Sequence, residues 1–446
     1  MAGLFRGMVR GFVPRKALLV SALWSFDFYY SPRFWAALAL VALVFRLLGS
    51  SALVRGAILL VASSALLLAL PRFGPVDLLL VWLISGVTFA AARLLCARPS
   101  GPSGPAPRRL WLALAGVLAA LAFLCFFKYR ALQDALLPAP MAARHASAGP
   151  LAGYFALLGV SYFTFKAVHV IVESYKGSIR TVGGLTFLNY MTFFPAFISG
   201  PIHRYPEFAA QLATDRPGAL KADLAAGGER IIHGLFKKFV LVPIIFPYIL
   251  TAPGRPLAAL TPVEAVLGLY AYAIYFYFDF SAYSDLAIGG ARVIGLTLPE
   301  NFNWPFLQKN IRDLWANWHM SLTSWLIDYV YWPVVRKLRN LEYFRPRPVL
   351  LSVVGMNVTF IACGIWHGEA VNFLLWGAYH GLGISIVNVY QRQKKRIRSA
   401  PLQRYFQSRA SRVVGAIGTF NFFALGLALF VLDIGQLRTL LSAVLR

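Results

Sequence analysis

Two Trp-His pairs, Trp318-His319 and Trp366-His367, lie inside an otherwise apolar chain and are the residues best suited to chemistry. A neutral imidazole accepts a proton near neutral pH, so it can take the proton of a hydroxyl group, the step that acyl transfer to an alcohol requires. Ionisable side chains inside membrane segments are costly and tend to be functional. The two pairs therefore predict chemistry that is carried out within the bilayer.

His367 is the stronger candidate of the two histidines. It follows the apolar run Asn357–Trp366, and a short Gly-Glu-Ala segment separates it from the next apolar run. A histidine at such a break can face a cavity while its neighbours pack. His380 would be rotated by about 220° from His367 on a continuous helix, which favours a packing role for it. Cys363 lies one helical turn before His367, so a thiol-imidazole dyad is an alternative.

The segment Ile311–Tyr329 predicts one continuous amphipathic helix, because its apolar residues recur at the helical period of about 3.6 residues. Asp313 and Asn317 turn away from the apolar stripe, and His319 lies at its border. The helix is too polar to span a bilayer, so we expect it at a membrane interface or in a protein-lined funnel. The stripe consists of Ile311, Leu314, Trp315, Trp318, Leu322, Trp325, Leu326 and Tyr329.

The composition is that of a membrane protein. Of 446 residues 59% are hydrophobic and 13% are charged, and the mean hydropathy is +0.63, which excludes a soluble enzyme. Apolar stretches near the length of a bilayer span recur along the chain, so we expect an all-α, polytopic protein with roughly ten to twelve transmembrane helices. The stretches are Trp35–Leu48, Ala52–Leu70, Val76–Leu95, Leu110–Phe127, Leu151–Val172, Ile231–Leu250, Ala265–Phe280, Val349–Trp366, Val371–Tyr390 and Val413–Leu432, with Gly184–Gly200 as a possible re-entrant segment.

The net charge of +26 lies in loops between the apolar stretches. Nucleic acid is therefore not an expected partner. The segment from Arg392 to Arg412 holds basic residues and no acidic one, and it should face the cytoplasm by the positive-inside rule. A loop facing water or lipid headgroups explains it without a specific docking site.

Three scattered cysteines support neither a disulfide framework nor a zinc site, and no metal is expected. The chain also lacks the G-x-S-x-G, H-E-x-x-H, Walker A and G-x-G-x-x-G motifs. Serine hydrolase, zinc protease, ATPase and dinucleotide enzyme are thus disfavoured.

Changes in composition divide the chain into five segments. They are a basic N-terminal lead-in (1–33), a group of N-terminal transmembrane helices (34–130), a core region with the polar motifs (151–390), a basic cytoplasmic loop (391–412) and a C-terminal transmembrane helix (413–446).

Four segments in the last two thirds of the chain together resemble the membrane-bound O-acyltransferase family, in its bacterial polysaccharide-modifying branch. They are FPAFISGPIHRYPEF (Phe194–Phe208), FDFSAYSDLAIG (Phe278–Gly289), ENFNWPFLQKNIRDLWANWHMSLTSWLIDYVYWP (Glu300–Pro333) and GIWHGEAVNFLLWGAYHG (Gly364–Gly381).

The resemblance implies a funnel-shaped core with re-entrant and interfacial helices. Through it a cytoplasmic thioester passes its acyl group to a hydroxyl acceptor outside, such as a cell-envelope polysaccharide or teichoic acid. His367 would be the base or the acyl-handling residue and His319 its polar partner; which of them touches donor or acceptor stays open. Further candidates for the substrate tunnel are Trp318, Trp366, Asn317, Asp285 and Tyr283.

Two groups within this branch compete. The D-alanyl-transfer group is favoured over the alginate and cellulose O-acetylases, so the donor is expected to be phosphopantetheine on an acyl carrier protein rather than acetyl-CoA, with no bound cofactor. The resemblance to this group implies that the stretch beginning at Trp332 contacts the carrier, and Val334, Val335, Arg336 and Lys337 would suit the carrier's acidic, phosphopantetheine-bearing helix. An ordinary positive-inside loop is the alternative reading of that segment.

The resemblance also implies a bacterial cytoplasmic membrane location and an extracytoplasmic partner protein that completes the transfer. A transporter or flippase of a lipid-linked glycan, with both histidines along its path, is the alternative outside the enzymes.

Overall fold

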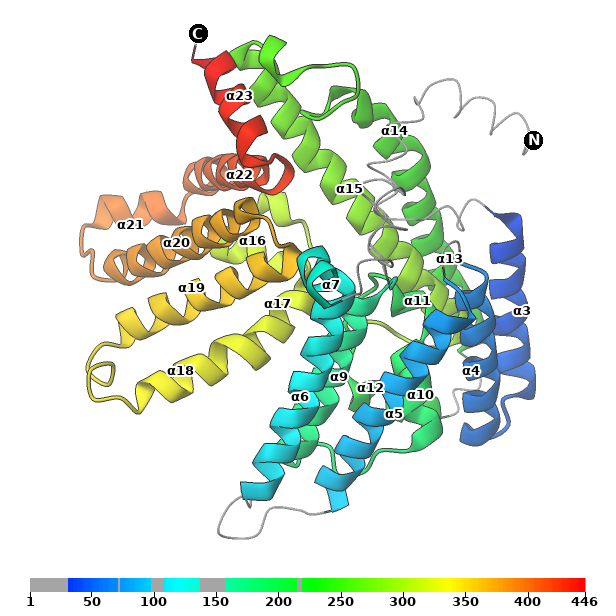
Figure 1. Ribbon diagram of the computed structural model, residues 1–446. Coiled ribbons are helices and arrows are strands. Elements are labelled where there is room, and N and C mark those ends of the chain that lie inside the picture. The colour runs from blue at the N-terminus through cyan, green and yellow to red at the C-terminus, as the bar shows by residue number, and fades with distance from the viewer. Residues whose placement is uncertain (1–30, 71–72, 98–106, 137–156, 215–218, 446) are drawn as a thin grey trace. The chain divides into compact units, whose positions relative to one another are not determined.

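The computed structural model describes residues 31–70, 73–97, 107–136, 157–214 and 219–445. In this part of the chain the regular structure is helical, apart from one isolated backbone bridge between Phe302 and Trp318. A helix satisfies its own backbone N–H and C=O groups, as lipid surroundings require. The predicted all-α, polytopic fold is confirmed (Figure 1). Most of the predicted N-terminal lead-in lies outside the described residues.

Six helical stretches of the described chain are long and apolar enough to cross a membrane. They are Pro75–Ala97, Pro107–Lys128, Leu220–Tyr248, Pro262–Ile294, Pro348–His367 and Arg409–Val431. Each overlaps a predicted span. The prediction of ten to twelve transmembrane helices also counted apolar stretches on helices outside these six, such as α4 (Ala52–Leu68) and α20 (Val371–Lys394).

The chain divides into two compact units. The N-terminal unit comprises the described residues between 31 and 233 and those from 283 to 299, and the C-terminal unit comprises residues 234–282 and 300–445. The helices of the N-terminal unit are α3 (Pro32–Leu48), α4, α5 (Pro75–Ala97), α6 (Pro107–Lys128), α7 (Arg130–Leu136), α9 (Val160–Lys176), α10 (Gly184–Thr192), α11 (Phe194–Phe197), α12 (Tyr205–Ala213) and most of α13 (Leu220–Phe236).

A buried carboxylate joins three helical segments of the N-terminal unit. Asp223 is fully buried, and its two oxygens lie 3.0 Å from Nη2 of Arg46 and 2.8 Å from Nε of Arg292. Arg46 also donates to the backbone carbonyls of Arg292 and Val293. A buried charge is tolerated when it is paired in this way.

The C-terminal unit contains the remaining helices. After η2 (Lys237–Leu241), α14 (Val242–Ile245), η3 (Phe246–Tyr248) and η4 (Leu257–Ala259) come α15 (Pro262–Ile294, through Ala282), η5 (Pro305–Leu307), α16 (Ile311–Asn317), α17 (Met320–Leu326), η6 (Ile327–Tyr331), α18 (Trp332–Arg339), α19 (Pro348–His367), α20, α21 (Ala400–Gln407), α22 (Arg409–Val431) and α23 (Ile434–Val444).

Helices α19 and α20 lie side by side and form a hairpin. Their backbones approach so closely that a Cβ atom on Gly364 would lie 2.3 Å from the carbonyl oxygen of Phe373, and one on Gly377 would lie 2.4 Å from that of Phe360. Small residues allow such contact between membrane helices, where packing replaces the hydrophobic effect. The hairpin fixes the end of α19, at which His367 lies.

We predict that Asp223→Asn lowers the free energy of unfolding by about 3 kcal/mol, the lower end for a broken buried ion pair because both arginines are partly exposed. Thermal denaturation of the purified protein in detergent measures it. Glu264→Gln is the matched control, since Glu264 pairs with Arg255 on an exposed surface and such pairs contribute little. Equal melting temperatures for Asp223→Asn and the parent would contradict the prediction.

Candidate active site

A cavity of about 240 Å³ lies among α15, α16, α17, α19, α20 and α22 of the C-terminal unit. Most of its lining is aromatic or aliphatic, as is usual for binding cavities. The side chains in the lining that carry a charge, an imidazole, a hydroxyl or a thiol are Arg312, His319, Thr323, Tyr331, Thr359, Cys363 and His367. The cavity therefore brings both predicted histidines together.

His319 lies at a break in the backbone between α16 and α17. Its backbone is left-handed, with φ 45° and ψ 51°, a conformation that is uncommon for a residue with a side chain and costs on the order of 1–3 kcal/mol. The continuous helix predicted for Ile311–Tyr329 is therefore wrong. The segment instead forms α16, a break at Trp318 and His319, and then α17, after which the chain continues as the π-helical η6.

Asn301 supplies the hydrogen bonds that hold this break. Its backbone carbonyl accepts from the N–H of Met320 at 2.9 Å, and its side-chain oxygen accepts from the hydroxyl of Ser321 at 2.6 Å and the N–H of Ser321 at 3.3 Å. Asn301 itself is fully buried. These bonds compete with the helix because they satisfy groups that would otherwise be unpaired in an apolar interior.

The ring of His319 is 5% exposed and meets the ring of Phe280 edge-on, with centroids 4.7 Å apart. Burial lowers the pKa of His319 to about 3, because desolvation disfavours the imidazolium. At neutral pH the imidazole is therefore uncharged, and its ring nitrogens can donate and accept hydrogen bonds.

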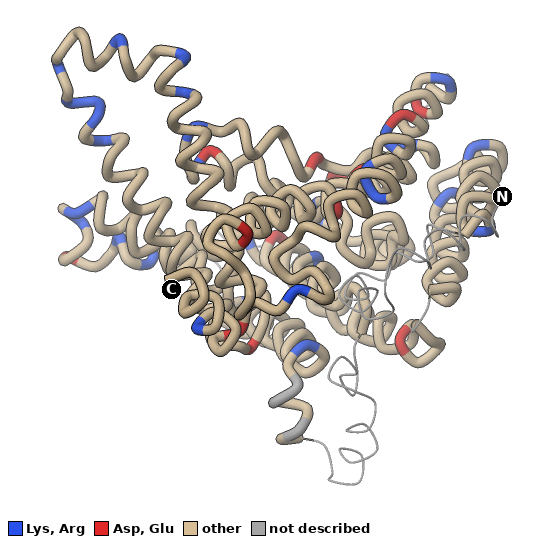
Figure 2. Tube along the Cα trace, turned by 90° about the horizontal axis from the view of Figure 1, so that it is seen from above, with Lys and Arg blue, Asp and Glu red and all other residues tan. Residues whose placement is uncertain are grey.

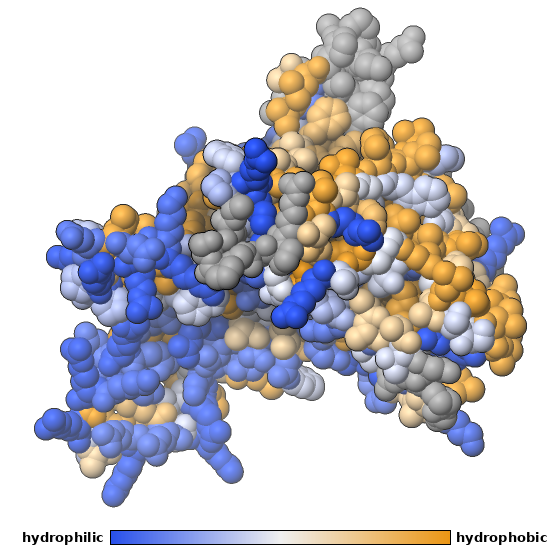
Figure 3. Space-filling model, turned by 90° about the horizontal axis from the view of Figure 1, so that it is seen from below, coloured by the Kyte–Doolittle hydropathy of each residue, from blue (hydrophilic) through white to orange (hydrophobic). Residues whose placement is uncertain are grey.

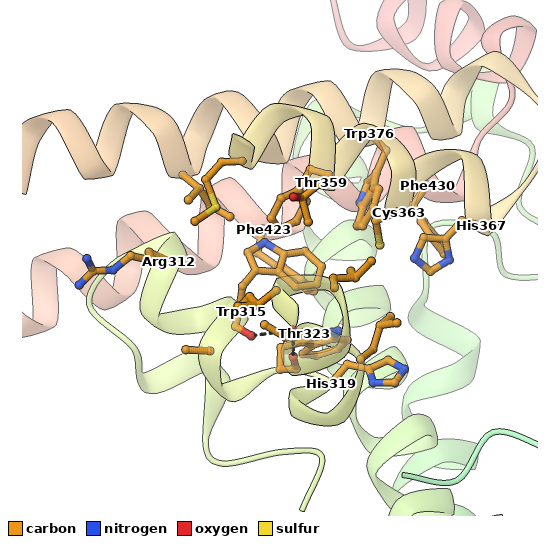
Figure 4. A pocket seen from close by; sticks show the side chains of 18 of the residues that line it. Arg312, Trp315, His319, Thr323, Thr359, Cys363, His367, Trp376, Phe423 and Phe430 are labelled. Atoms are coloured by element: carbon orange, nitrogen blue, oxygen red, sulfur yellow. Dashed lines mark hydrogen bonds between the residues drawn. The ribbon is translucent and has the colours of Figure 1, made fainter. Parts of the chain in front are cut away.

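His367 is the last residue of α19, as its place at the end of an apolar run predicted. Aromatic rings surround it, with centroid distances of 4.5 Å to Trp366, 5.0 Å to Trp376 and 4.8 Å to Phe430. In Figure 4 the two imidazoles lie toward one end of the lining and Arg312 lies at the other. The cavity thus has one end with two imidazoles and one end with a cation.

The side chain of Trp376 lies between His367 and the buried His380. Its ring lies 4.9 Å from that of His380, and the Nδ1 atom of His380 accepts from Nε1 of Trp315 at 3.3 Å. His380 is thus a packing residue, as predicted, although the reason differs: α19 and α20 are two helices, not one.

The other tunnel candidates are placed differently. Trp318 lines the cavity, whereas the described lining includes neither Trp366 nor Asn317, whose amide donates to the carbonyl of Asp313 at 2.8 Å. Tyr283 and Asp285 belong to the N-terminal unit. There Tyr283 accepts a hydrogen bond from the N–H of Ser199 at 3.2 Å, and Asp285 pairs with Arg230 at 2.9 Å.

The predicted docking residues all lie on α18 but differ in exposure. Trp332, Arg336 and Lys337 are exposed and Val334 is half-buried. Val335 is buried against α19, because a Cβ on Gly355 would lie 2.7 Å from its Cγ2 atom. Val335 therefore holds α18 in place and is not part of the exposed surface.

Sequence reasoning missed Asn301, Trp376 and Arg312 as parts of the site. The signal for Asn301 was its place in a polar segment just before the Trp-His pair, but hydrogen bonds across about twenty residues cannot be read from helical period. Trp376 and Arg312 reach the cavity only through the packing of α20 and α16.

Residues 110–429 match the model of the membrane-bound O-acyltransferase family, and the chain belongs to that family. It is an acyltransferase and a multi-pass membrane protein. It is 33% identical over 279 residues to a teichoic acid D-alanyltransferase of Bacillus subtilis, covering 61% of this chain and 68% of that protein. It is 31% identical over 288 residues to a probable alginate O-acetylase, AlgI, of Pseudomonas syringae, covering 63% of this chain and 52% of that protein.

We predict that Asn301→Ala lowers the free energy of unfolding by about 1–3 kcal/mol and lowers acyl transfer, because Ser321 loses the acceptor that fixes the break at His319. Melting temperature and turnover are measured on the same preparation. Asn303→Ala is the matched control, since Asn303 is exposed and bonds through its backbone. Equal losses in the two variants would refute a specific role for Asn301.

Proposed function

We propose that this protein takes an acyl group from a cytoplasmic thioester and transfers it across the bacterial cytoplasmic membrane to a hydroxyl group of a cell-envelope polysaccharide or teichoic acid. The observation that carries the proposal is the pair of imidazoles, His319 and His367, in one apolar cavity. Membership of an acyltransferase family leaves the flippase alternative without support.

The chemistry needs a base, a donor to the oxyanion and a proton for the leaving thiol. In our proposal His367 takes the proton of the attacking hydroxyl as its oxygen bonds to the thioester carbonyl carbon. The C–S bond then breaks, and the proton passes to the sulfur, so that a thiol leaves and an ester remains. His319, held neutral, aligns the acceptor or the thioester.

Trp376 is our candidate for the oxyanion donor. Its Nε1 is buried, and it has no hydrogen-bond partner among the described residues. The side chain lines the cavity and its ring lies 5.0 Å from that of His367. A fixed N–H donor in an apolar site stabilises developing negative charge more than it would in water.

The acyl group has two candidates. Similarity to teichoic acid D-alanyltransferases supports a D-alanyl group delivered by phosphopantetheine on an acyl carrier protein. The composition of the cavity favours an acetyl group from acetyl-CoA, because its described lining holds no Asp or Glu to pair with the ammonium of a D-alanyl group. Both donors carry phosphate, for which Arg312 offers an exposed guanidinium.

We predict that the protein in liposomes transfers label from a D-alanyl carrier protein to membrane-associated glycan, and that His367→Ala lowers kcat by about 10²- to 10⁴-fold through loss of the base. Acetyl-CoA is tested in parallel, together with His319→Ala. His233→Ala is the matched control, because His233 is exposed.

Turnover from acetyl-CoA alone would mean that the donor is acetyl-CoA and not the D-alanyl carrier protein. Turnover from neither donor, or activity indifferent to His367, would refute the proposed mechanism.

We further predict that the double variant Arg336→Glu, Lys337→Glu raises KM for the carrier protein on the order of tenfold and leaves kcat unchanged, because charges at an interface act on encounter and not on chemistry. Steady-state kinetics with varied carrier concentration measures it. Arg438→Glu on α23 is an exposed control. An unchanged KM would mean that α18 does not bind the carrier.

A further inference from the structure

A second cavity, of about 500 Å³, lies in the C-terminal unit apart from the imidazoles. It is a groove bounded by α20, α21, α22 and the segment Lys309–Ile311, and we call it the basic groove. Its lining combines two ammonium groups, from Lys309 and Lys394, with an extended apolar wall. The mechanism proposed above uses none of these residues.

The surroundings of the basic groove are strongly cationic. Eight Lys and Arg residues and no Asp or Glu lie between Arg392 and Arg412. Figure 2 shows Lys and Arg gathered at the projecting ends on the left, the side to which α18 to α22 point in Figure 1. Figure 3 shows a largely hydrophilic surface on the same side. The positive potential of these Lys and Arg residues attracts an anion.

Close packing holds together the elements that carry the two lysines. Lys394 lies over the ring of Phe406, with Nζ 4.1 Å from its centroid, so α21 is tied to α20. A Cβ on Gly415 would lie 2.6 Å from the carbonyl oxygen of Lys309, so α22 is seated directly against that segment. The groove is therefore built by close contacts between its elements.

The walls of the basic groove are apolar and open. Ile386 is 67% exposed and Val414 is 60% exposed, and Tyr390 and Tyr405 extend the same lining. Gly418 lines it as well, and a Cβ at that position would have no atom within 4 Å. A bare inorganic ion does not need such a wall, whereas a molecule with an acidic head and an apolar chain does.

We propose that the basic groove binds an anionic phospholipid of the membrane, with its phosphate at Lys309 and Lys394 and an acyl chain along Ile386, Val414 and Gly418. The positive-inside rule sets this end of α20 and α22 at the cytoplasmic leaflet, where anionic lipids meet basic segments. The bound lipid joins α20, α21 and α22, and α20 and α22 also line the catalytic cavity.

Native mass spectrometry of the full chain in detergent tests the proposal, with titration of dioleoyl-phosphatidylglycerol, dioleoyl-phosphatidylcholine and free glycerol 3-phosphate. We expect phosphatidylglycerol to bind on the order of tenfold more tightly than phosphatidylcholine, since each lysine near a phosphate contributes several-fold. The double variant Lys309→Gln, Lys394→Gln should lose this preference.

Gly418→Leu fills the open part of the groove and should lower phosphatidylglycerol binding without unfolding the protein, because leucine is a better helix former than glycine. Gly228→Leu on α13 is the matched control, since a Cβ there also has no atom within 4 Å, and it should bind as the parent does. Melting temperatures of all variants verify their folding.

Equal binding of the two lipids, or unchanged phosphatidylglycerol binding in Gly418→Leu, would overturn the proposal. Competition by glycerol 3-phosphate as effective as that of the lipid would show a phosphate site and would also overturn it. Lipid binding that survives in the lysine variant while acyl carrier protein binding is lost would assign the surface to the carrier instead.

Discussion

The hydrogen bonds that Met320 and Ser321 donate to Asn301 are the interaction on which the cavity of the two histidines depends. They allow a backbone break inside an apolar environment, where unpaired N–H and C=O groups are expensive. The break turns His319 toward the cavity in a left-handed conformation that a regular helix would not permit. Strain at a functional position persists only when the surrounding structure over-determines it, and here a buried amide does so.

Aromatic packing gives the second histidine its orientation. His367 lies against Trp376, Trp376 lies against His380, and His380 accepts a hydrogen bond from Trp315. This chain of contacts passes from the end of α19 through α20 to α16, so it connects three helices. Preorganised groups in a site with few polar neighbours act more strongly than the same groups in water, because no solvent has to be reordered during reaction.

In the C-terminal unit the charged side chains lie mainly on exposed helix ends and not in the cavity. The cavity of the two histidines is mostly apolar and keeps His319 neutral, whereas the exposed ends of α18, α20 and α21 carry Lys and Arg with few acidic residues. An acyl carrier protein is acidic, so the basic ends of these helices match the carrier part of the donor that we propose. Arg312 lies at the end of the lining opposite the two imidazoles.

The sequence by itself determined the membrane class, the helical fold and the family, because apolar runs of bilayer length and the Trp-His motifs are local features. It also located His367 at the end of a span, since an apolar run stops there. Only the tertiary structure decided that Ile311–Tyr329 is broken at His319, that Val335 is buried, and that Asn301 and Trp376 support the site. Each of these depends on a partner distant in sequence, and helical period carries no information about such partners.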